Sequence, residues 1–271
     1  MTKGELIFEG NEKQVFATDH PDQVIFRYKD VTVAYNNVKR ARFKGTGALA
    51  DGSEITNEPG AVVVVNQNRM EGVRRLGGLQ SAGNATILLN YLNQHGVETH
   101  FIELLGEKEQ LCRKIEIIPL QVVVHNRIAG SLAARLGVED GYRHSNTIVD
   151  LRYNNDALED PFINRDHAVA LGLATYEDLD GMYDTARKVN DLLKPLFHKA
   201  GIELVDMKIE FGRASDTGDI IISDEISPDT CRLWDEATEE RLDKDRFRLD
   251  LSRVVESYTN VLNRLKQVIE A

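Results

Sequence analysis

Hydrophobic and polar residues alternate along the segment "LVDMKIEFG", from Leu204 to Gly212. A period of two predicts a β-strand with two unlike faces. We expect an apolar face of Val205, Met207, Ile209 and Phe211 and a charged face of Asp206, Lys208 and Glu210. This row of alternating negative, positive and negative side chains differs from the Thr, Ser or Gln residues of an ordinary solvated strand face, and its role needs explaining.

Other apolar runs predict further strands before and after this segment. The expected strands are residues 5–10, 13–18, 23–28, 31–35, 61–66, 98–104, 110–118 and 120–128, with 43–66 as an extended hairpin. Helical periodicity predicts helices at 82–95, 131–137 and 176–200, with Thr175 as a cap, and a last helix from Asp245 onward. Pro119 is the expected boundary between two lobes.

The turn signal "SDTG" predicts that Leu204–Arg213 pairs with Asp219–Ile226 as a hairpin. That pairing would bring Asp224 and Glu225 toward Asp206 and leave Glu210 nearer the turn. Carboxylates with a lysine among them suit Mg²⁺ and a polyphosphate, because Mg²⁺ takes one or two carboxylates plus phosphate oxygens. An exposed hairpin whose outer face is merely charged is the alternative.

Three other segments carry candidate chemistry. Ser131 is expected to cap the helix in "AGSLAARLG", where free backbone N–H groups could hold an anion, although such a serine often only caps. Gly10 in "FEGNEKQVF" predicts a turn between two strands, with Lys13 just past it. Such a loop can lie over nucleotide phosphates, although a short Gly-x-x-Lys alone is weak evidence for it. "SPDTCRLWD" contains Arg232 and has no clear periodicity, and "DKDRFR" adds the basic residues Lys244, Arg246 and Arg248.

Composition narrows the class of protein. The chain has 271 residues, of which 42% are hydrophobic and 28% charged, as in a soluble globular protein. Its net charge of −11 argues against a nucleic-acid partner, since such binders neutralise phosphates with Lys and Arg. No apolar run is long enough for a membrane span or a signal peptide, so Cys112 and Cys231 are expected to be reduced in the cytoplasm.

Taken in order, several of these segments resemble the SAICAR synthetase family of purine biosynthesis. The matching segments are the Gly-x-x-Lys hairpin, "VVHNRIAGSLAARLG", "NNDALEDPFIN", "LVDMKIEFG", "SDEISPDTCRLWD" and "DKDRFR". The resemblance implies an α+β fold of two lobes with antiparallel sheets and an ATP cleft between them. Residues 1–118 would form the ATP-binding lobe, with an insertion near 53–78, and 119–271 the lobe with the acidic hairpin. A homodimer is plausible by the same resemblance.

The resemblance also implies a reaction and a set of roles. The family joins a carboxylate on an azole ribonucleotide to L-aspartate through an acyl phosphate, converting ATP to ADP and phosphate. The implied catalytic residues are Asp206, Lys208 and Asp224. ATP would contact Gly10, Lys13, Glu210 and Asp224, and Mg²⁺ would be held by Glu210 and Asp224. The implied substrate-binding residues are His125, Ser131, Asp156, Asp160, Arg232, Lys244 and Arg248.

Four positions depart from the family pattern: Asn11, Asn36, His125 and Asn154. Three of them replace a permanently charged Lys or Arg, since histidine is only partly protonated near neutral pH. One alternative is therefore a paralogue with the same chemistry on another azole carboxylate, such as a pyrazole analogue in nucleoside-antibiotic biosynthesis. Two others are a non-catalytic nucleotide-binding protein and a kinase-like phosphotransferase.

Overall fold

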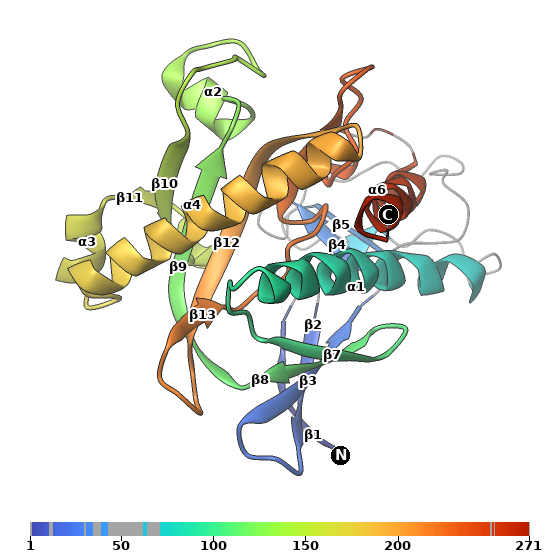
Figure 1. Ribbon diagram of the computed structural model, residues 1–271, viewed down its shortest axis with the longest axis vertical. Helices are drawn as coiled ribbons and strands as arrows, with labels where there is room; N and C mark the ends of the chain where they lie inside the picture. Colours follow the sequence, from blue (N-terminus) through green and yellow to red (C-terminus); the bar gives the residue numbers. More distant parts are fainter. Residues whose placement is uncertain are drawn as a thin grey trace.

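The chain folds into an α+β structure with two large antiparallel sheets, shown as a computed structural model in Figure 1. The structure describes residues 2–10, 13–29, 31–34, 39–42, 62–63, 71–249, 251 and 253–270. The predicted fold class is therefore confirmed. Within the described residues, no helix is long and apolar enough to cross a membrane.

The first sheet comes from the N-terminal part of the chain and has the strand order β1-β2-β3-β8-β7. Its strands are β1 (Lys3–Glu9), β2 (Lys13–Thr18), β3 (Gln23–Tyr28), β7 (Phe101–Gly106) and β8 (Glu109–Arg113). A small sheet contains β4 (Val31–Ala34), β5 (Lys39–Arg42) and β6 (Val62–Val63). Apart from β6, the predicted hairpin at 43–66 lies outside the described residues.

Helix α1 (Glu71–Gln94) begins before the predicted start at residue 82, so the end of the predicted insertion near 53–78 is helical. The rest of that insertion, apart from β6, lies outside the described residues. Gly96 follows the helix with a φ of +72°, a conformation that favours glycine and ends the helix. The C-terminal helix α6 (Val254–Ile269) packs against α1 (Figure 1).

The predicted single helix from Asp245 onward is wrong. The chain forms a short helix α5 (Asp245–Arg248), and α6 begins only after Arg253, which has a φ of +66°. Ion pairs of Asp245 with Arg232 and Arg248 hold the short helix at the cavity described below. Local periodicity could not show the place of α5, because the ion pair with Arg232 joins it to a distant strand.

The predicted strands at 110–118 and 120–128 are divided at a different residue. β8 ends at Arg113, and β9 (Ile115–His125) runs through Pro119 and belongs to the second sheet. Proline is tolerated there because the pairing of β9 with β12 has a bulge, so no ladder hydrogen bond from its nitrogen is needed. The two large sheets therefore divide at Lys114, before the lobe boundary predicted at 118.

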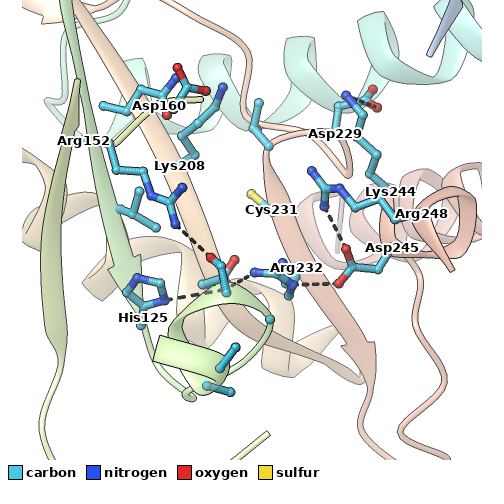
Figure 2. Close-up of a pocket in the computed structure, with 18 of the residues that line it drawn as sticks. His125, Arg152, Asp160, Lys208, Asp229, Cys231, Arg232, Lys244, Asp245 and Arg248 are labelled. Atoms are coloured by element: carbon cyan, nitrogen blue, oxygen red, sulfur yellow. Dashed lines mark hydrogen bonds and ion pairs between the residues drawn. The ribbon is translucent and has the colours of Figure 1, made fainter. Parts of the chain in front are cut away.

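The second sheet has the order β11-β10-β9-β12-β13, and β14 also pairs with β12. Its remaining strands are β10 (Ile148–Tyr153), β11 (Phe162–Ile163), β12 (Ile202–Ala214), β13 (Ile220–Ile222) and β14 (Cys231–Asp235). Side chains on one face of β10, β9 and β12 surround a cavity, which Figure 2 shows. Their register forms three rows: Arg152, Gln121 and Glu210; Asp150, Val123 and Lys208; Ile148, His125 and Asp206.

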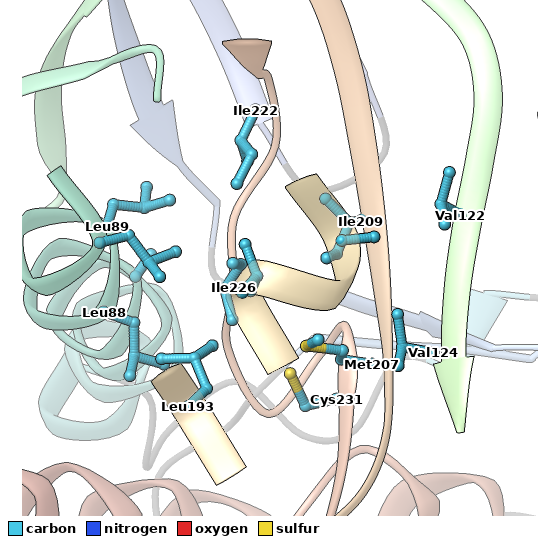
Figure 3. Close-up of a cluster of buried hydrophobic side chains, with 14 of the residues drawn as sticks. Leu88, Leu89, Val122, Val124, Leu193, Met207, Ile209, Ile222, Ile226 and Cys231 are labelled. Carbon is cyan, nitrogen blue, oxygen red and sulfur yellow. The ribbon is translucent and has the colours of Figure 1, made fainter. Parts of the chain in front are cut away.

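The opposite face of the second sheet packs on the main hydrophobic core, part of which Figure 3 shows. Helix α4 (Tyr176–Lys199) covers this face and contributes a fully buried stripe that includes Leu179, Val189 and Leu193. Thr175 caps α4, since its side chain accepts a hydrogen bond from the backbone N–H of Asp178. The predicted helix and its cap are confirmed.

The apolar face predicted for the charged strand needs one correction. Met207, Ile209 and Phe211 lie in the main core, but Val205 packs in a separate cluster with Ala129 and Trp234. A bulge near Val205 causes the change, because it reverses the side to which the following residues point. The charged face of Asp206, Lys208 and Glu210 is unaffected.

Candidate active site

A cavity of about 1000 Å³ lies over the polar face of β10, β9 and β12 (Figure 2). Helix α2 (Ser131–Leu136) closes one side, and residues that follow β13 and β14 close the other. Most of the predicted site residues line this cavity, namely His125, Ser131, Asp160, Asp206, Lys208, Asp224, Arg232, Lys244 and Arg248. The structure thus brings together residues that are far apart in the sequence.

The other predicted site residues take different positions. Gly10, Lys13 and Glu210 are not among the residues that line the cavity, although Lys13 and Glu210 contact residues that do. Asp156 lies in the short 3₁₀ helix Asp156–Leu158, and its side chain is outside the described part of the chain. Asn11 and Asn36 are outside the described residues as well.

The hairpin prediction placed Asp224 and Glu225 incorrectly. β13 ends at Ile222, which pairs with Phe211, and the backbone N–H of Ser223 then donates to the carbonyl of Glu210. Asp224 therefore lies near Glu210 rather than near Asp206. β14 takes the place beside Asp206 instead, with Arg232 as its cross-strand partner.

Lys13 connects the first sheet to this acidic group. Its Nζ forms an ion pair with Asp224 and lies 2.8 Å from Glu225 Oε1. Burial disfavours the charged form of Lys13, but the carboxylates of Asp224 and Glu225 outweigh burial and raise the pKa of Lys13 well above its usual value. Burial likewise opposes ionisation of Asp224, but Lys13 and Lys208 lower the pKa of Asp224 to about 2. Both groups are charged at neutral pH.

Glu210 completes a cluster with an excess of negative charge. Lys208 Nζ lies 2.9 Å from Glu210 Oε1. Burial raises the pKa of Glu210, and Lys208 opposes this increase while Asp224 adds to it. Three carboxylates, from Glu210, Asp224 and Glu225, thus share two ammonium groups, those of Lys13 and Lys208.

These residues fit a magnesium ion that a nucleotide helps to bind. In the described part of the chain, no group of three or more His, Cys, Asp or Glu side chains forms a metal site by itself. Mg²⁺ uses one or two carboxylates and completes its octahedral shell with water and phosphate oxygens. Glu210 and Asp224 could supply that pair, and a cation would offset their excess charge.

Arg232 joins two acidic residues at the other end of the cavity. Its Nη1 donates to Asp206 Oδ2 at 2.6 Å, and its Nε donates to Asp245 Oδ2 at 2.7 Å. Burial opposes ionisation of Asp206, but Arg232 and then His125 lower the pKa of Asp206 to about 2. The segment "SPDTCRLWD", which showed no periodicity in the sequence, contains β14, and this strand places Arg232 beside Asp206.

Ser131 does not cap its helix as predicted. Gly130 occupies the N-cap position, and its backbone N–H donates to Asp140 Oδ1 at 2.7 Å. Ser131 Oγ instead accepts a hydrogen bond from Arg152 Nη2 at 2.9 Å. Gly130 has a φ of +57°, and a Cβ atom there would lie only 2.4 Å from Arg232 Nη2. Glycine at this position therefore lets the guanidinium of Arg232 approach the helix start.

His125 lies between two carboxylates beneath the cavity. Its Nδ1 is 3.6 Å from Asp206 Oδ2, and its Nε2 is 3.5 Å from Asp150 Oδ2. Burial disfavours the imidazolium, but Asp150 and Asp206 outweigh burial and raise the pKa of His125. A series of charges of alternating sign then runs from helix α2 across the sheet to helix α5, in the order Arg135, Asp150, His125, Asp206, Arg232, Asp245 and Arg248.

Replacing His125 with glutamine is expected to destabilise the fold by about 1 kcal/mol at pH 6. A raised pKa means that the folded state binds the proton more tightly than the unfolded state, whose pKa is near 6.5. The wild-type advantage should therefore be complete below pH 6.5 and disappear as the pH rises through the folded pKa. Urea unfolding from pH 6 to 9 measures the difference in free energy of unfolding between the two proteins, and a variant at an exposed histidine, His20→Gln, is the control. A pH-independent difference would show that His125 acts as a neutral side chain.

Several cavity residues were not singled out as site residues from the sequence. Asp229 accepts hydrogen bonds from Ser81 of α1 at 2.8 Å and Tyr258 of α6 at 2.9 Å, and Lys244 Nζ lies 3.9 Å away. Asp229 thus ties both helices to the cavity wall. Arg152 and Gln121 also line the cavity. The alternation of β10, which points Asp150 and Arg152 to one face, was the available signal.

Comparisons with known proteins give relatives that match almost the whole chain. Residues 65–265 match a family model described as SAICAR synthetase. A phosphoribosylaminoimidazole-succinocarboxamide synthase of Clostridium acetobutylicum is 45% identical over 265 residues, which cover 98% of this chain and 99% of that protein.

Solved structures are similar over almost the whole chain. The crystal structure of phosphoribosylaminoimidazole-succinocarboxamide synthase from Ehrlichia chaffeensis is 36% identical, with a TM-score of 0.82, and the match covers 97% of this chain and 98% of that one. A SAICAR synthetase in complex with ADP is 37% identical, with a TM-score of 0.81 and the same coverage. Sequence and fold thus give the same relationship.

Proposed function

Because this chain belongs to the SAICAR synthetase family of ATP-dependent C–N ligases, we propose that it joins an aminoimidazole carboxylate ribonucleotide to L-aspartate. ATP would be converted to ADP and phosphate through an acyl phosphate. The observation that carries the proposal is the division of the cavity into two charged ends. Asp224 lies at one end with Lys13 and Lys208, and Arg232 lies at the other with Asp206 and His125.

ATP is assigned to the end of the cavity near Lys13. This lysine reaches from β2 to Asp224, so it joins the two sheets at the place where phosphates would enter. Glu210 and Asp224 would hold Mg²⁺, which would offset the negative charge of the phosphates. Lys13 could then move partly away from Asp224 and form an ion pair with the phosphates. The related SAICAR synthetase structure with ADP supports nucleotide use by this fold.

The first step forms the acyl phosphate. A carboxylate oxygen of the ribonucleotide attacks the γ-phosphorus of ATP, the bond from that phosphorus to the β,γ-bridging oxygen breaks, and ADP leaves. Lys208 extends from the middle of the polar face between Asp206 and Glu210, where it can steer the anionic carboxylate toward ATP. Catalysis of this kind depends mainly on positioning and on neutralising charge.

The second step forms the amide. The ammonium group of aspartate first gives up one proton to solvent, and the resulting amine attacks the acyl carbon. The bond from that carbon to the phosphoryl oxygen breaks, and the departing phosphate takes the second proton that the amine loses. Asp206 is held ionised by Arg232 and His125, so it can attract and orient the ammonium group of aspartate before the attack. Lys244 and Arg248 line the same cavity and could bind the carboxylates of aspartate.

Purified protein is expected to release one ADP for each succinocarboxamide formed from ATP, Mg²⁺, aspartate and the aminoimidazole carboxylate ribonucleotide. Coupled ADP detection and product mass measure both yields. A phosphorylated product that accumulates in the presence of aspartate would instead identify a phosphotransferase. Magnesium-dependent ATP binding without product would reject this substrate and direct the assay to pyrazole and other azole carboxylates. Loss of ATP binding as well would identify a protein without this catalytic activity.

A further inference from the structure

Arg152 lies in the cavity and forms no ion pair with a carboxylate in the described part of the chain. It extends from β10 and lines the cavity with Arg232, Arg241 and Arg248. Arg232 forms ion pairs with Asp206 and Asp245. Arg241 pairs with Asp140, and Arg248 pairs with Asp245. Among the described residues, Arg152 forms no such pair, so its charge is available to a ligand.

The guanidinium of Arg152 is nevertheless held in one place. Its Cζ lies 4.0 Å from the centre of the Phe162 ring, and its Nη2 donates to Ser131 Oγ at 2.9 Å. Its Nε is buried and has no hydrogen-bond partner among the residues that the structure describes. Stacking on an aromatic ring leaves the donors in the guanidinium plane directed sideways, where they can bind an oxyanion. The side chain is therefore oriented before a ligand binds.

The surroundings of Arg152 favour an anion as the ligand. Burial lowers the pKa of Arg152, and Asp150 and Asp160 only partly offset that effect. A guanidinium removed from water without a paired carboxylate is costly unless an anion completes its hydrogen bonds. Ser131 accepts from Arg152, and its own O–H hydrogen can donate to the same anion.

The position of Arg152 indicates which anion it meets. In the sheet order, β10 lies on one side of β9 and β12, whereas Asp224 follows β13 on the other side and pairs with Lys13. The reacting carboxylate must lie near the ATP end. Arg152 lies in the same cross-strand row as Glu210, but β9 separates the two, so a group bound by Arg152 and Ser131 lies across the cavity from the ATP end. In a ribonucleotide, the anion on the far side from the reacting carboxylate is the phosphate ester.

We infer that Arg152, together with Ser131, binds the phosphate of the ribonucleotide substrate. This inference rests on the proposed function for the identity of the ligand. It also accounts for two departures noted in the sequence, because Arg152 restores a fixed positive charge close to Asn154 and on the same face as His125. The pocket would thus have moved its guanidinium to a neighbouring strand.

The test compares two unreactive ligands that differ only in the phosphate, an aminoimidazole carboxamide ribonucleotide and its riboside. Calorimetry without ATP gives both dissociation constants and their ratio. Wild-type protein is expected to prefer the ribonucleotide by at least about 100-fold, and Arg152→Gln should reduce this ratio by about 10- to 100-fold. Arg152→Lys should recover only part of the preference, because an ammonium group lacks the planar fork.

Arg135→Gln is the matched control. Arg135 also stacks on Phe162, at 3.5 Å from the ring centre, but it pairs with Asp150 and is not among the residues that line the cavity. The Arg135→Gln variant should keep the wild-type ratio of the two dissociation constants. An unchanged ratio in Arg152→Gln, or no phosphate preference in the wild type, would overturn the inference. Because the ligands cannot be ligated, a preserved phosphate preference with no ligase activity would reject the proposed reaction and leave the role of Arg152 standing.

Discussion

Replacing Asp224 with asparagine is expected to lower turnover about 1000-fold while the protein remains folded. The change keeps the shape of the side chain but removes the charge that faces Lys13, Lys208 and Glu210. Stabilisation of transition-state charge by a bound metal contributes several kcal/mol, and each 1.36 kcal/mol corresponds to a tenfold change in rate. Steady-state assays across a range of magnesium concentrations measure the loss, and a raised magnesium requirement should accompany it.

Asp216→Asn is the control for this prediction. Asp216 lies on the β12–β13 turn and pairs with Arg113 rather than with a cavity residue. The Asp216→Asn variant should keep turnover within about twofold of wild type, since exposed ion pairs of this kind contribute little to the stability of the fold. Thermal unfolding of both variants checks that the fold is kept, and Lys13 retains Glu225 as a partner in Asp224→Asn. Near-normal turnover in Asp224→Asn would remove Asp224 from the proposed metal site.

Replacing Gly130 with alanine is expected to reduce kcat/KM by about 10- to 100-fold. The new Cβ would lie 2.4 Å from Arg232 Nη2 and 2.7 Å from Arg232 Cζ, so the guanidinium must move. Moving it weakens its hydrogen bonds to Asp206 and Asp245 and leaves these carboxylates less well compensated. The left-handed φ adds about 1–3 kcal/mol of backbone strain. Kinetics and urea unfolding measure the two effects separately.

Gly137→Ala separates backbone strain from displacement of Arg232. Gly137 ends the same helix with a φ of +67°, and an added Cβ there would meet nothing within 4 Å. That variant should lose about 1 kcal/mol of stability and keep its kcat/KM. Equal kinetic losses in both variants would show that the helix as a whole, rather than Arg232, accounts for the effect of Gly130→Ala.

Local sequence patterns predicted the elements whose stability comes mainly from neighbouring residues. Helix α4 is one such element, because its cap and its buried stripe are encoded within the segment from Thr175 to Lys199. The charged face of β12 is another, since Asp206, Lys208 and Glu210 alternate with core residues whatever the strand pairs with. Most of the candidate site followed from the same strand and from motifs in a few short segments.

Long-range pairing determined what those patterns could not show. β14 lies beside β12 because Cys231 and Met207 pair across the sheet, and this pairing brings Arg232 to Asp206. The early end of β13 moves Asp224 away from Asp206 and toward Lys13. Neither result follows from periodicity, because the hydrogen bonds that set strand register join residues distant in the chain.

The sequence by itself thus determined the α+β class, the charged strand and the family resemblance. These three features depend on residue type and spacing, because the spacing of apolar residues sets which side chains share a face of a helix or strand. Only the tertiary structure decided which charges neutralise one another and which remain available. Arg152 shows the difference: in the sequence it is one residue of an ordinary strand, but the folded chain places it over Phe162, half-buries it and gives it no ion pair with a carboxylate among the described residues. The packing of distant segments sets that electrostatic balance.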